Sequence, residues 1–247
     1  MKMVVYRFIR WIVRLIYPKT EIIGLENLPE GPAVIVGNHT QMHGPIASDL
    51  YFPPVRYIWC AGEMMHLKDV PAYAFKDFWS EKPKSVRWFF KIMSYVIAPL
   101  SVCIFNENNT IGVYHDNRII GTFKTTVAKL AEKARIVIFP ESSEKRNNII
   151  YEFNDGYLNV ARLYYRKTKE KLKFVPMYVA PALKQMHICS PIEFDPEADF
   201  EEEKRRINDY LMNEITEKAY SLPHHTVVPF KNIPKSDYPD NTRAYFH

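Results

Sequence analysis

Three short polar clusters hold the side chains of this 247-residue chain that are best suited to chemistry. They are Asn38-His39, Asp116-Asn117-Arg118 and Glu141-Ser142-Ser143. Each cluster follows an apolar, β-branched run of the kind that forms buried strands. In parallel sheets covered by helices, ligands bind beyond the carboxyl ends of the strands. The pattern therefore predicts that the three clusters converge on one site.

His39 is the candidate catalytic base. A neutral imidazole takes a proton from an alcohol or an amine as that group attacks a carbonyl carbon; the plainer alternative is a loop histidine satisfied by hydrogen bonds. His43 lies four residues further on, so a helical segment would bring both imidazoles to one face, as zinc ligands require. The zinc-protease pattern also needs Glu after the first histidine, and Thr40 stands there. We expect no metal, and a metal hydrolase stays the weaker alternative.

The remaining polar residues suit an anionic or hydroxylated substrate. Arg118 can clamp a phosphate through two parallel hydrogen bonds, or it can form a surface ion pair with Asp116. Glu141 can orient an imidazole or accept a substrate hydroxyl, or it can cap a turn. Hydroxyl groups and positive charge follow it, unless these residues form only a solvated loop: Ser142, Ser143, Lys145 and Arg146.

Strand and helix patterns alternate around these clusters. Strands are predicted at residues 33–39, 110–118, 135–139 and 173–181, and helices at 122–134, 157–168 and 199–220. The apolar segment 86–105 predicts a further helix that ends before Pro99, either buried or facing acyl chains. Alternating elements of this kind predict an α/β fold with a mainly parallel sheet flanked by helices.

The chain divides into three predicted parts. Residues 1–19 form an amphipathic helix, residues 20–221 the main domain, and residues 222–247 a proline-rich, irregular C-terminal arm. In the first part, Arg7, Arg10 and Arg14 make a basic stripe about 60° wide. The opposite face is apolar and holds Val4, Val5, Ile9, Ile12, Val13 and Ile16. These features favour a helix in the membrane interface, with a helix packed on the domain as the alternative.

The net charge of the chain indicates which kinds of partner to expect, and its cysteine content indicates the cellular compartment. The net charge of +5 suits an anionic partner such as a membrane surface or a phosphorylated substrate. The basic residues are dispersed and the aromatic residues have core spacing, so we expect no nucleic acid as partner. The three cysteines are far apart, which predicts a reduced chain facing the cytosol.

Taken together, the clusters resemble the glycerolipid acyltransferase family, which includes 1-acylglycerol-3-phosphate acyltransferases. The resemblance runs from about Gly24 to Pro181. It rests on the lead-in "GLENLPEGPAVIVGNH", on "IGVYHDNR", on "IFPESSEKR" and on Val175-Pro176 in "KFVPMYVAP". In the family, the first motif is Asn-His, four residues, then Asp, and the third is Phe-Pro-Glu-Gly-Thr-Arg.

The resemblance implies a peripheral or monotopic membrane enzyme that moves an acyl group to the hydroxyl of a glycerolipid, in phospholipid biosynthesis. His39 would deprotonate the acceptor, Arg118 with Lys145 or Arg146 would hold its phosphate, and Glu141 would shape the acceptor site. Asn38, Ser142 and Ser143 would also line the substrate site. The co-substrate would be acyl-CoA or acyl-carrier protein, without a cofactor or metal, and membrane lipids would be the partners.

Two departures from the family pattern leave alternatives open. Gly44 replaces the motif Asp, so His43, Asp49 or Glu141 would have to orient His39. Ser142-Ser143-Glu144 replaces Gly-Thr-Arg, which leaves the acceptor open. A catalytically impaired lipid-binding protein on the same fold is therefore the second hypothesis.

Overall fold

The computed structural model describes residues 2–80, 82–107 and 109–243. The chain forms two compact units. The larger unit holds residues 18–57 and the chain from residue 126 onward, and the smaller unit holds residues 1–17 and 58–125. The predicted domain of residues 20–221 contributes to both units, and residues 244–247 of the predicted arm lie outside the described residues.

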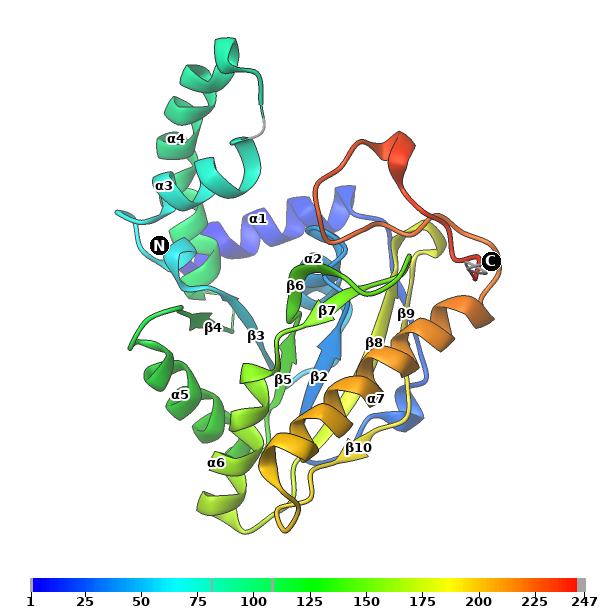
Figure 1. Ribbon diagram of the computed structural model, residues 1–247. Coiled ribbons are helices and arrows are strands. Elements are labelled where there is room, and N and C mark those ends of the chain that lie inside the picture. Colours follow the sequence, from blue (N-terminus) through cyan, green and yellow to red (C-terminus); the bar gives the residue numbers. More distant parts are fainter. Residues whose placement is uncertain (1, 81, 108, 244–247) are drawn as a thin grey trace. The chain divides into compact units, whose positions relative to one another are not determined.

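The larger unit is built on a sheet whose strands are mainly parallel (Figure 1). Its strand order is β1 (Glu21–Ile23), β9 (Gln185–Ile188), β8 (Lys173–Ala180), β2 (Ala33–Gly37) and β5 (Arg135–Ile138). Strand β2 runs parallel to both β5 and β8, β1 runs parallel to β9, and the β8–β9 pair is antiparallel. The short strand β10 (Ile192–Glu193) pairs with the start of β8.

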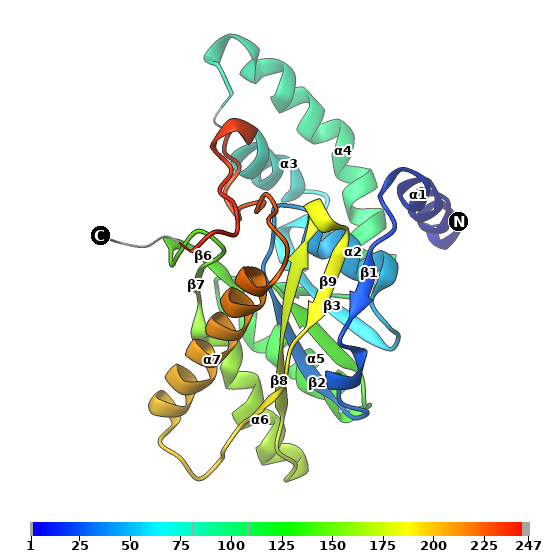
Figure 2. The ribbon, with the colours of Figure 1, turned by 90° about the vertical axis from the view of Figure 1, so that its right-hand side faces the viewer.

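The central strands are apolar along their whole length because helices and loops cover both of their faces. All five residues of β2 are buried, and so is every residue of β8 after Lys173. Helices α6 (Asn159–Thr168) and α7 (Phe200–Ser221) lie on one face of this sheet (Figure 2). The helix predicted at 199–220 is confirmed, and its apolar residues Ile207, Leu211 and Ile215, spaced four apart on one face, are fully buried.

The third polar cluster forms a hairpin rather than a solvated loop. Strand β6 (Glu141–Lys145) pairs antiparallel with β7 (Tyr151–Phe153). The turn forms because the Asn147 side-chain oxygen accepts the N–H groups of Ile149 and Ile150, at 2.8 and 3.0 Å. Side-chain capping of this kind stabilises a tight turn that strand periodicity alone does not reveal.

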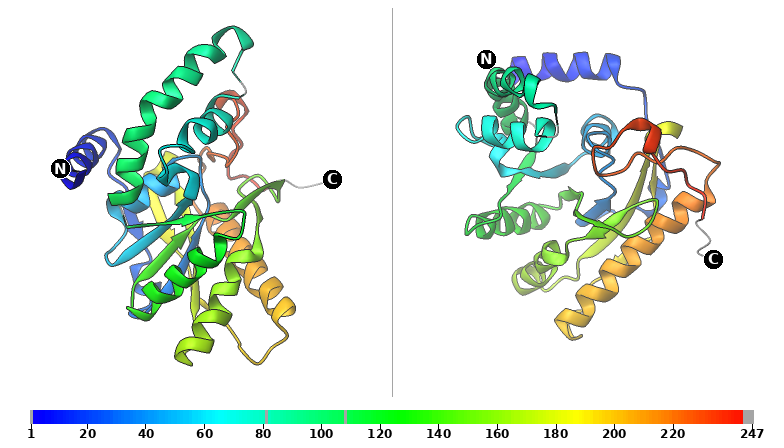
Figure 3. Two further views of the ribbon diagram at one scale, coloured as in Figure 1. Left: turned by 90° about the vertical axis from the view of Figure 1, so that its left-hand side faces the viewer. Right: turned by 45° about the horizontal axis from the view of Figure 1, so that its top comes forward.

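The smaller unit contains helices α1 (Lys2–Ile16), α3 (Val70–Ala74) and α4 (Arg87–Glu107), with strand β4 (Thr110–Val113). Strand β4 pairs in parallel with β3 (Arg56–Ala61), which belongs to this unit from Ile58 on. Helix α5 (Ile119–Ala131) begins in this unit and ends in the larger one. Helix α1 packs against α4 (Figure 3).

The prediction that the apolar helix ends before Pro99 is wrong, because α4 continues to Glu107. Proline inside a helix costs about 3 kcal/mol, so other contacts must compensate. The small residues Ser94, Ala98 and Ser101 are buried on one face, and the Ser101 hydroxyl donates to the Met64 carbonyl at 3.0 Å. Pro99 lies on the exposed side, where its missing N–H disturbs no packed contact.

Both helices of the smaller unit expose large apolar side chains. On α1, Ile9, Ile12 and Val13 of the predicted apolar face are partly covered. Val4, Val5 and Ile16 of the same face are exposed, and Val4 forms an exposed stripe with Phe8, Trp11 and Leu15, which are 56–69% exposed. Helix α4 exposes Trp88, Phe89, Ile92, Tyr95, Val96 and Leu100. Residues 84–107 are also the one described segment long and apolar enough to cross a membrane, by length and composition alone.

Candidate active site

The site begins where β2 ends, at Asn38. Its side-chain amide donates to the Val179 carbonyl at 3.0 Å, and its oxygen accepts the Val179 N–H at 2.7 Å. Asn38 is 1% exposed. Both polar groups of Asn38 therefore join the end of β2 to β8, which fixes the start of the loop that carries His39.

Glu141 fixes the other side of this loop. Its Oε2 accepts the main-chain N–H of His39 at 2.5 Å, and its Oε1 accepts the N–H of Tyr151 at 2.9 Å. One carboxylate thus joins the loop after β2 to the β6–β7 hairpin. Glu141 contacts the main chain of His39, so its carboxylate is not the group that orients the imidazole ring.

Burial changes the protonation of Glu141. The side chain is 7% exposed, and burial raises its pKa to about 7, against the opposing effect of the two N–H donors. The folded protein therefore binds this proton more tightly than the unfolded chain does. The stabilisation is fully present below about pH 4.5 and is lost as the pH rises through about 7.

Replacement of Glu141 by Gln is expected to remove this pH dependence. The wild-type free energy of unfolding should fall by roughly 3 kcal/mol between about pH 4.5 and pH 8 through this group, and the variant should lack that slope. At low pH the variant should be less stable by about 1–3 kcal/mol, because its NH2 group faces a main-chain N–H. Urea midpoints at several pH values measure both effects; parallel curves for the two proteins would contradict the assignment.

The main chain after His39 is strained. Thr40 and Gln41 have φ angles of 47° and 54°, in the left-handed region that β-branched residues such as threonine rarely adopt. Strain of this kind costs about 1–3 kcal/mol per residue and concentrates at functional sites. The turn closes with the Gly44 N–H donating to the His39 carbonyl at 3.1 Å, and helix α2 (His43–Tyr51) starts there.

The position of this turn tests the alternative hypothesis that His39 and His43 bind zinc from one face of a helix. His39 lies before α2, so the two imidazoles do not occupy successive turns of one helix. Within the described ranges, no group of three or more His, Cys, Asp or Glu side chains is placed to hold a metal ion. The geometry on which the metal hydrolase hypothesis depended is therefore absent from this segment.

The His39 imidazole lies between two phenylalanine rings. The ring centroids of Phe139 and Phe230 are each 5.6 Å from that of His39, edge to face at 74° and 77°. The His39 Nδ1 atom is buried without a hydrogen-bond partner in the described part of the chain. Burial lowers the pKa of His39 to about 4, against the opposing effect of a hydrogen bond with the Gln41 main chain. The ring is therefore neutral at pH 7, which is the form that accepts a proton.

Gly44 leaves no room for a side chain. A Cβ atom there would lie 2.8 Å from Cε1 of Phe139 and 2.9 Å from the carbonyl oxygens of both Asn38 and His39. Two of these neighbours are main chain and are held by the hydrogen bonds described above. A carboxylate at this position would therefore require α2 or the His39 loop to shift, because the two approach each other closely at Gly44.

The structure brings Asn38, His39, Gly44 and Glu141 together. His43 is partly buried, and burial, followed by the charge of Lys235, lowers its pKa. Ser142 accepts the Glu144 N–H at 3.2 Å, and Ser143 and Lys145 are exposed.

Arg146 is engaged by acidic side chains. Its guanidinium lies 3.3 Å from Glu152 and 3.5 Å from Asp209, and it donates to Asn213 at 3.2 Å. Two carboxylates therefore balance its charge. A role for Arg146 in holding an acceptor phosphate would require it to leave these partners.

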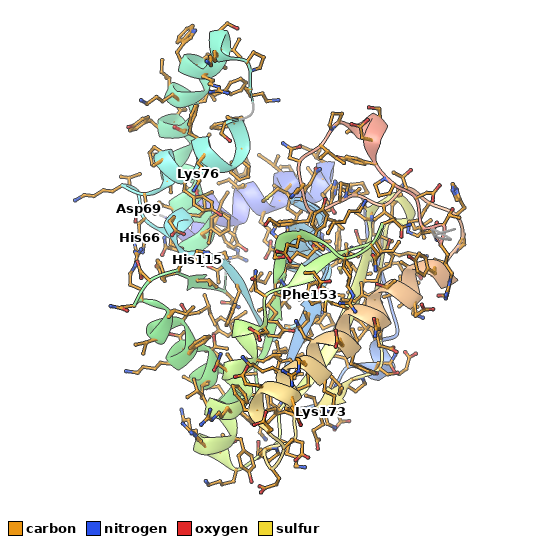
Figure 4. The ribbon with its side chains drawn as sticks, viewed as in Figure 1. His66, Asp69, Lys76, His115, Phe153 and Lys173 are labelled. Atoms are coloured by element: carbon orange, nitrogen blue, oxygen red, sulfur yellow. The ribbon has the colours of Figure 1, made fainter. Side chains whose placement is uncertain are left out.

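Arg118 belongs to the smaller unit and forms the surface ion pair considered as its alternative role. Its Nε donates to both Asp116 oxygens, at 3.0 and 2.9 Å, and its guanidinium lies 4.1 Å from the Tyr114 ring centroid. The same unit carries His66, which hydrogen bonds the Tyr114 hydroxyl at 2.8 Å, and His115 (Figure 4). The convergence of Arg118 with His39 stays a prediction.

Residues of the C-terminal arm were missed by the sequence patterns. Phe230 contacts His39, and the Tyr238 hydroxyl accepts a hydrogen bond from Gln41 at 2.8 Å. The arm has no helical or strand periodicity, and its four prolines predict only an irregular surface path. The aromatic residues among those prolines were the only signal for contact with the site.

The fold and the site together define an α/β protein with a neutral, buried histidine at the carboxyl end of a parallel strand. Residues 19–180 match the Acyltransferase family, and the chain belongs to that family. The solved structure of the 1-acyl-sn-glycerophosphate acyltransferase PlsC from Thermotoga maritima is similar, with a TM-score of 0.52 and 13% sequence identity over 89% of this chain and 80% of that one. That likeness shows the shared fold. No curated protein matches the chain.

Proposed function

We propose that this protein transfers a fatty acyl group from a thioester donor, acyl-CoA or acyl-carrier protein, to the hydroxyl of a glycerolipid such as 1-acylglycerol-3-phosphate or a related polar acceptor. The observation that carries the proposal is the neutral His39 imidazole at the end of β2. Glu141 bonds the main chain of His39, and Asn38 joins the preceding residue to β8. The family and the fold of the PlsC structure support acyl transfer in phospholipid biosynthesis.

In the proposed reaction, a ring nitrogen of His39 takes the proton of the acceptor hydroxyl as that oxygen attacks the thioester carbonyl. The tetrahedral intermediate then collapses, the carbon–sulfur bond breaks, and the imidazolium returns its proton to the departing thiolate. The donor is a co-substrate, so the reaction needs no cofactor or metal. We propose that Arg118 and Lys145 supply the positive charge for an acceptor phosphate.

Incubation of the purified protein with a labelled acyl donor and a lipid extract tests the proposal. The expected result is release of free thiol together with a labelled lipid whose mass identifies the acceptor. Parallel reactions with acyl-CoA and acyl-carrier protein distinguish the donors. Absence of any labelled product with either donor would overturn the proposal.

An impaired lipid-binding protein is the second candidate, because in the described part of the chain His39 Nδ1 has no hydrogen-bond partner and Glu141 bonds only the His39 main chain. That candidate predicts binding of lipid vesicles without thiol release from either donor. The same incubation therefore separates the two hypotheses.

We further propose that the smaller unit docks on a membrane surface facing the cytoplasm. The exposed stripe Val4, Phe8, Trp11 and Leu15 is bordered on α1 by the arginine stripe, which is the arrangement of an interfacial helix. Helix α4 buries its small residues and exposes its aromatic and aliphatic ones, the reverse of a helix that faces water.

Replacement of Phe8 and Trp11 by Ser should weaken binding to anionic phospholipid vesicles at least about tenfold, because each buried large side chain contributes about 1.5–3 kcal/mol. Vesicle co-sedimentation measures the change. Leu163→Ser is the matched control, since Leu163 is an exposed leucine of α6 in the other unit. Equal binding by the double variant and the control would contradict the assignment of α1.

A further inference from the structure

The C-terminal arm, residues 222–243, is firmly attached at its base. The Asn241 amide donates to the Ala219 and Leu222 carbonyls at 2.8 and 3.1 Å, and its oxygen accepts the His225 N–H at 2.8 Å. His225 is buried, with Nδ1 2.7 Å from the Pro223 carbonyl and Nε2 2.8 Å from the Tyr178 hydroxyl. A carbonyl only accepts, so Nδ1 carries a hydrogen, and in the neutral ring Nε2 then accepts the Tyr178 hydroxyl.

Between these attachments the arm forms a closed loop. Thr226 and Asp240 form a bridge, and the Val227 N–H donates to the Pro239 carbonyl at 2.8 Å. The segment 228–238 between them reaches the His39 loop. Phe230 lies 5.6 Å from the His39 ring and 5.7 Å from the Tyr151 ring, measured between centroids. The base of the arm thus holds Phe230 at a defined place.

Two positions at which a carboxylate could orient the His39 imidazole, residues 44 and 141, do not supply one to the ring. Gly44 has no side chain and no space for one. Both Glu141 oxygens are bonded to main-chain N–H groups. The buried Nδ1 of His39 has no hydrogen-bond partner in the described chain. Besides the Gln41 main chain, the interactions that the structure offers to restrain the ring are its contacts with Phe139 and Phe230.

We infer that Phe230 is a positioning residue, which together with Phe139 holds the His39 imidazole in its reactive orientation in place of the carboxylate. This inference rests on the proposed function. Two rings that meet the imidazole edge to face restrict its rotation, and their apolar surface keeps it neutral by excluding water. The C-terminal arm therefore completes the site although it lies outside the matched family region.

Phe230→Ala is expected to lower kcat about 10- to 100-fold with little change in KM for donor or acceptor, because a misplaced catalytic group costs up to about 100-fold. Solvation of the ring should raise the pKa of His39 from about 4 toward 6.5, so the acid limb of the kcat/KM profile moves to higher pH. NMR titration of the His39 ring in the full chain measures this pKa directly. Phe230→Tyr, which keeps the ring, should restore most of the activity.

The titration must be read on His39 itself, because other groups around the loop also ionise. These are Glu141, His43, Tyr151, Lys231 and Lys235. Phe200→Ala is the matched control: Phe200 is also half-buried and ring-paired, but it is the first residue of α7 and pairs with Phe194 next to β10, at the opposite end of β8 from Asn38.

Two results would overturn the inference. One is a Phe230→Ala variant with the wild-type His39 pKa and wild-type kcat. The other is a rise in kcat/KM, which would show that Phe230 obstructs the site. If the wild-type protein transfers no acyl group, the proposed function fails, while an NMR pKa shift in Phe230→Ala would still show that Phe230 shields the His39 ring.

Discussion

His39→Ala should reduce acyl transfer by about 10²–10⁴-fold, the range that general-base catalysis contributes. The substitution removes the group that takes the acceptor proton, while the hydrogen bond from the residue 39 main chain to Glu141 remains possible. Fold and loop should therefore persist. The measurement is thiol release with the acceptor that the labelled-donor experiment identifies, together with a urea midpoint for stability.

His43→Ala is the control for this prediction. His43 lies at the first turn of α2, and its ring is influenced by Lys235. Its replacement should lower the rate much less than that of His39. Equal loss in both variants would show that the two imidazoles act as a pair, and an active His39→Ala variant would place the base elsewhere.

Gly44→Asp should fail to improve activity and should damage the fold, although it recreates the family motif. The new Cβ would lie within 2.9 Å of two carbonyl oxygens, and the added carboxylate would be close to those same oxygens. Overpacking costs about 1–3 kcal/mol, and an unpaired buried charge adds to this. We expect a lower urea midpoint and weaker acyl transfer than in the wild type.

Two alanine variants separate the effect of crowding by a Cβ atom from the effect of the added charge in Gly44→Asp. Gly44→Ala adds only the Cβ and should lose about 1–3 kcal/mol through crowding. Gly121→Ala, also in a helix, adds a Cβ that meets nothing within 4 Å, so it should gain roughly 0.5–1 kcal/mol. Activity above wild type in Gly44→Asp would contradict the view that this site works without a motif carboxylate.

Strand β2, the α7 stripe and the family were predictable because they depend on patterns over neighbouring residues. Burial of β2 follows from its uninterrupted β-branched run, and the α7 stripe follows from the 3.6-residue period. The motifs around His39 and Glu141 lie at set positions along the chain, which is enough to recognise the acyltransferase family.

The helix through Pro99 could not be predicted from local propensity. Proline disfavours a helix interior, and the compensating contacts of Ser94, Ala98 and Ser101 come from tertiary packing. The hairpin after Pro140 was missed for a similar reason. Its strands are short, and β6 has a polar sequence without the apolar alternation that indicates a strand.

The sequence by itself determined the fold class, the family and His39 as the candidate base, since these follow from local periodicity and motif order. The tertiary structure decided the environment of that histidine: the main-chain role of Glu141, the closed space at Gly44 and the contact with Phe230. The contacts of Glu141 and Phe230 with residue 39 join positions about 100 to 190 apart along the chain. Such pairs meet only when the sheet, the hairpin and the C-terminal arm are packed together, so no pattern of neighbouring residues encodes them.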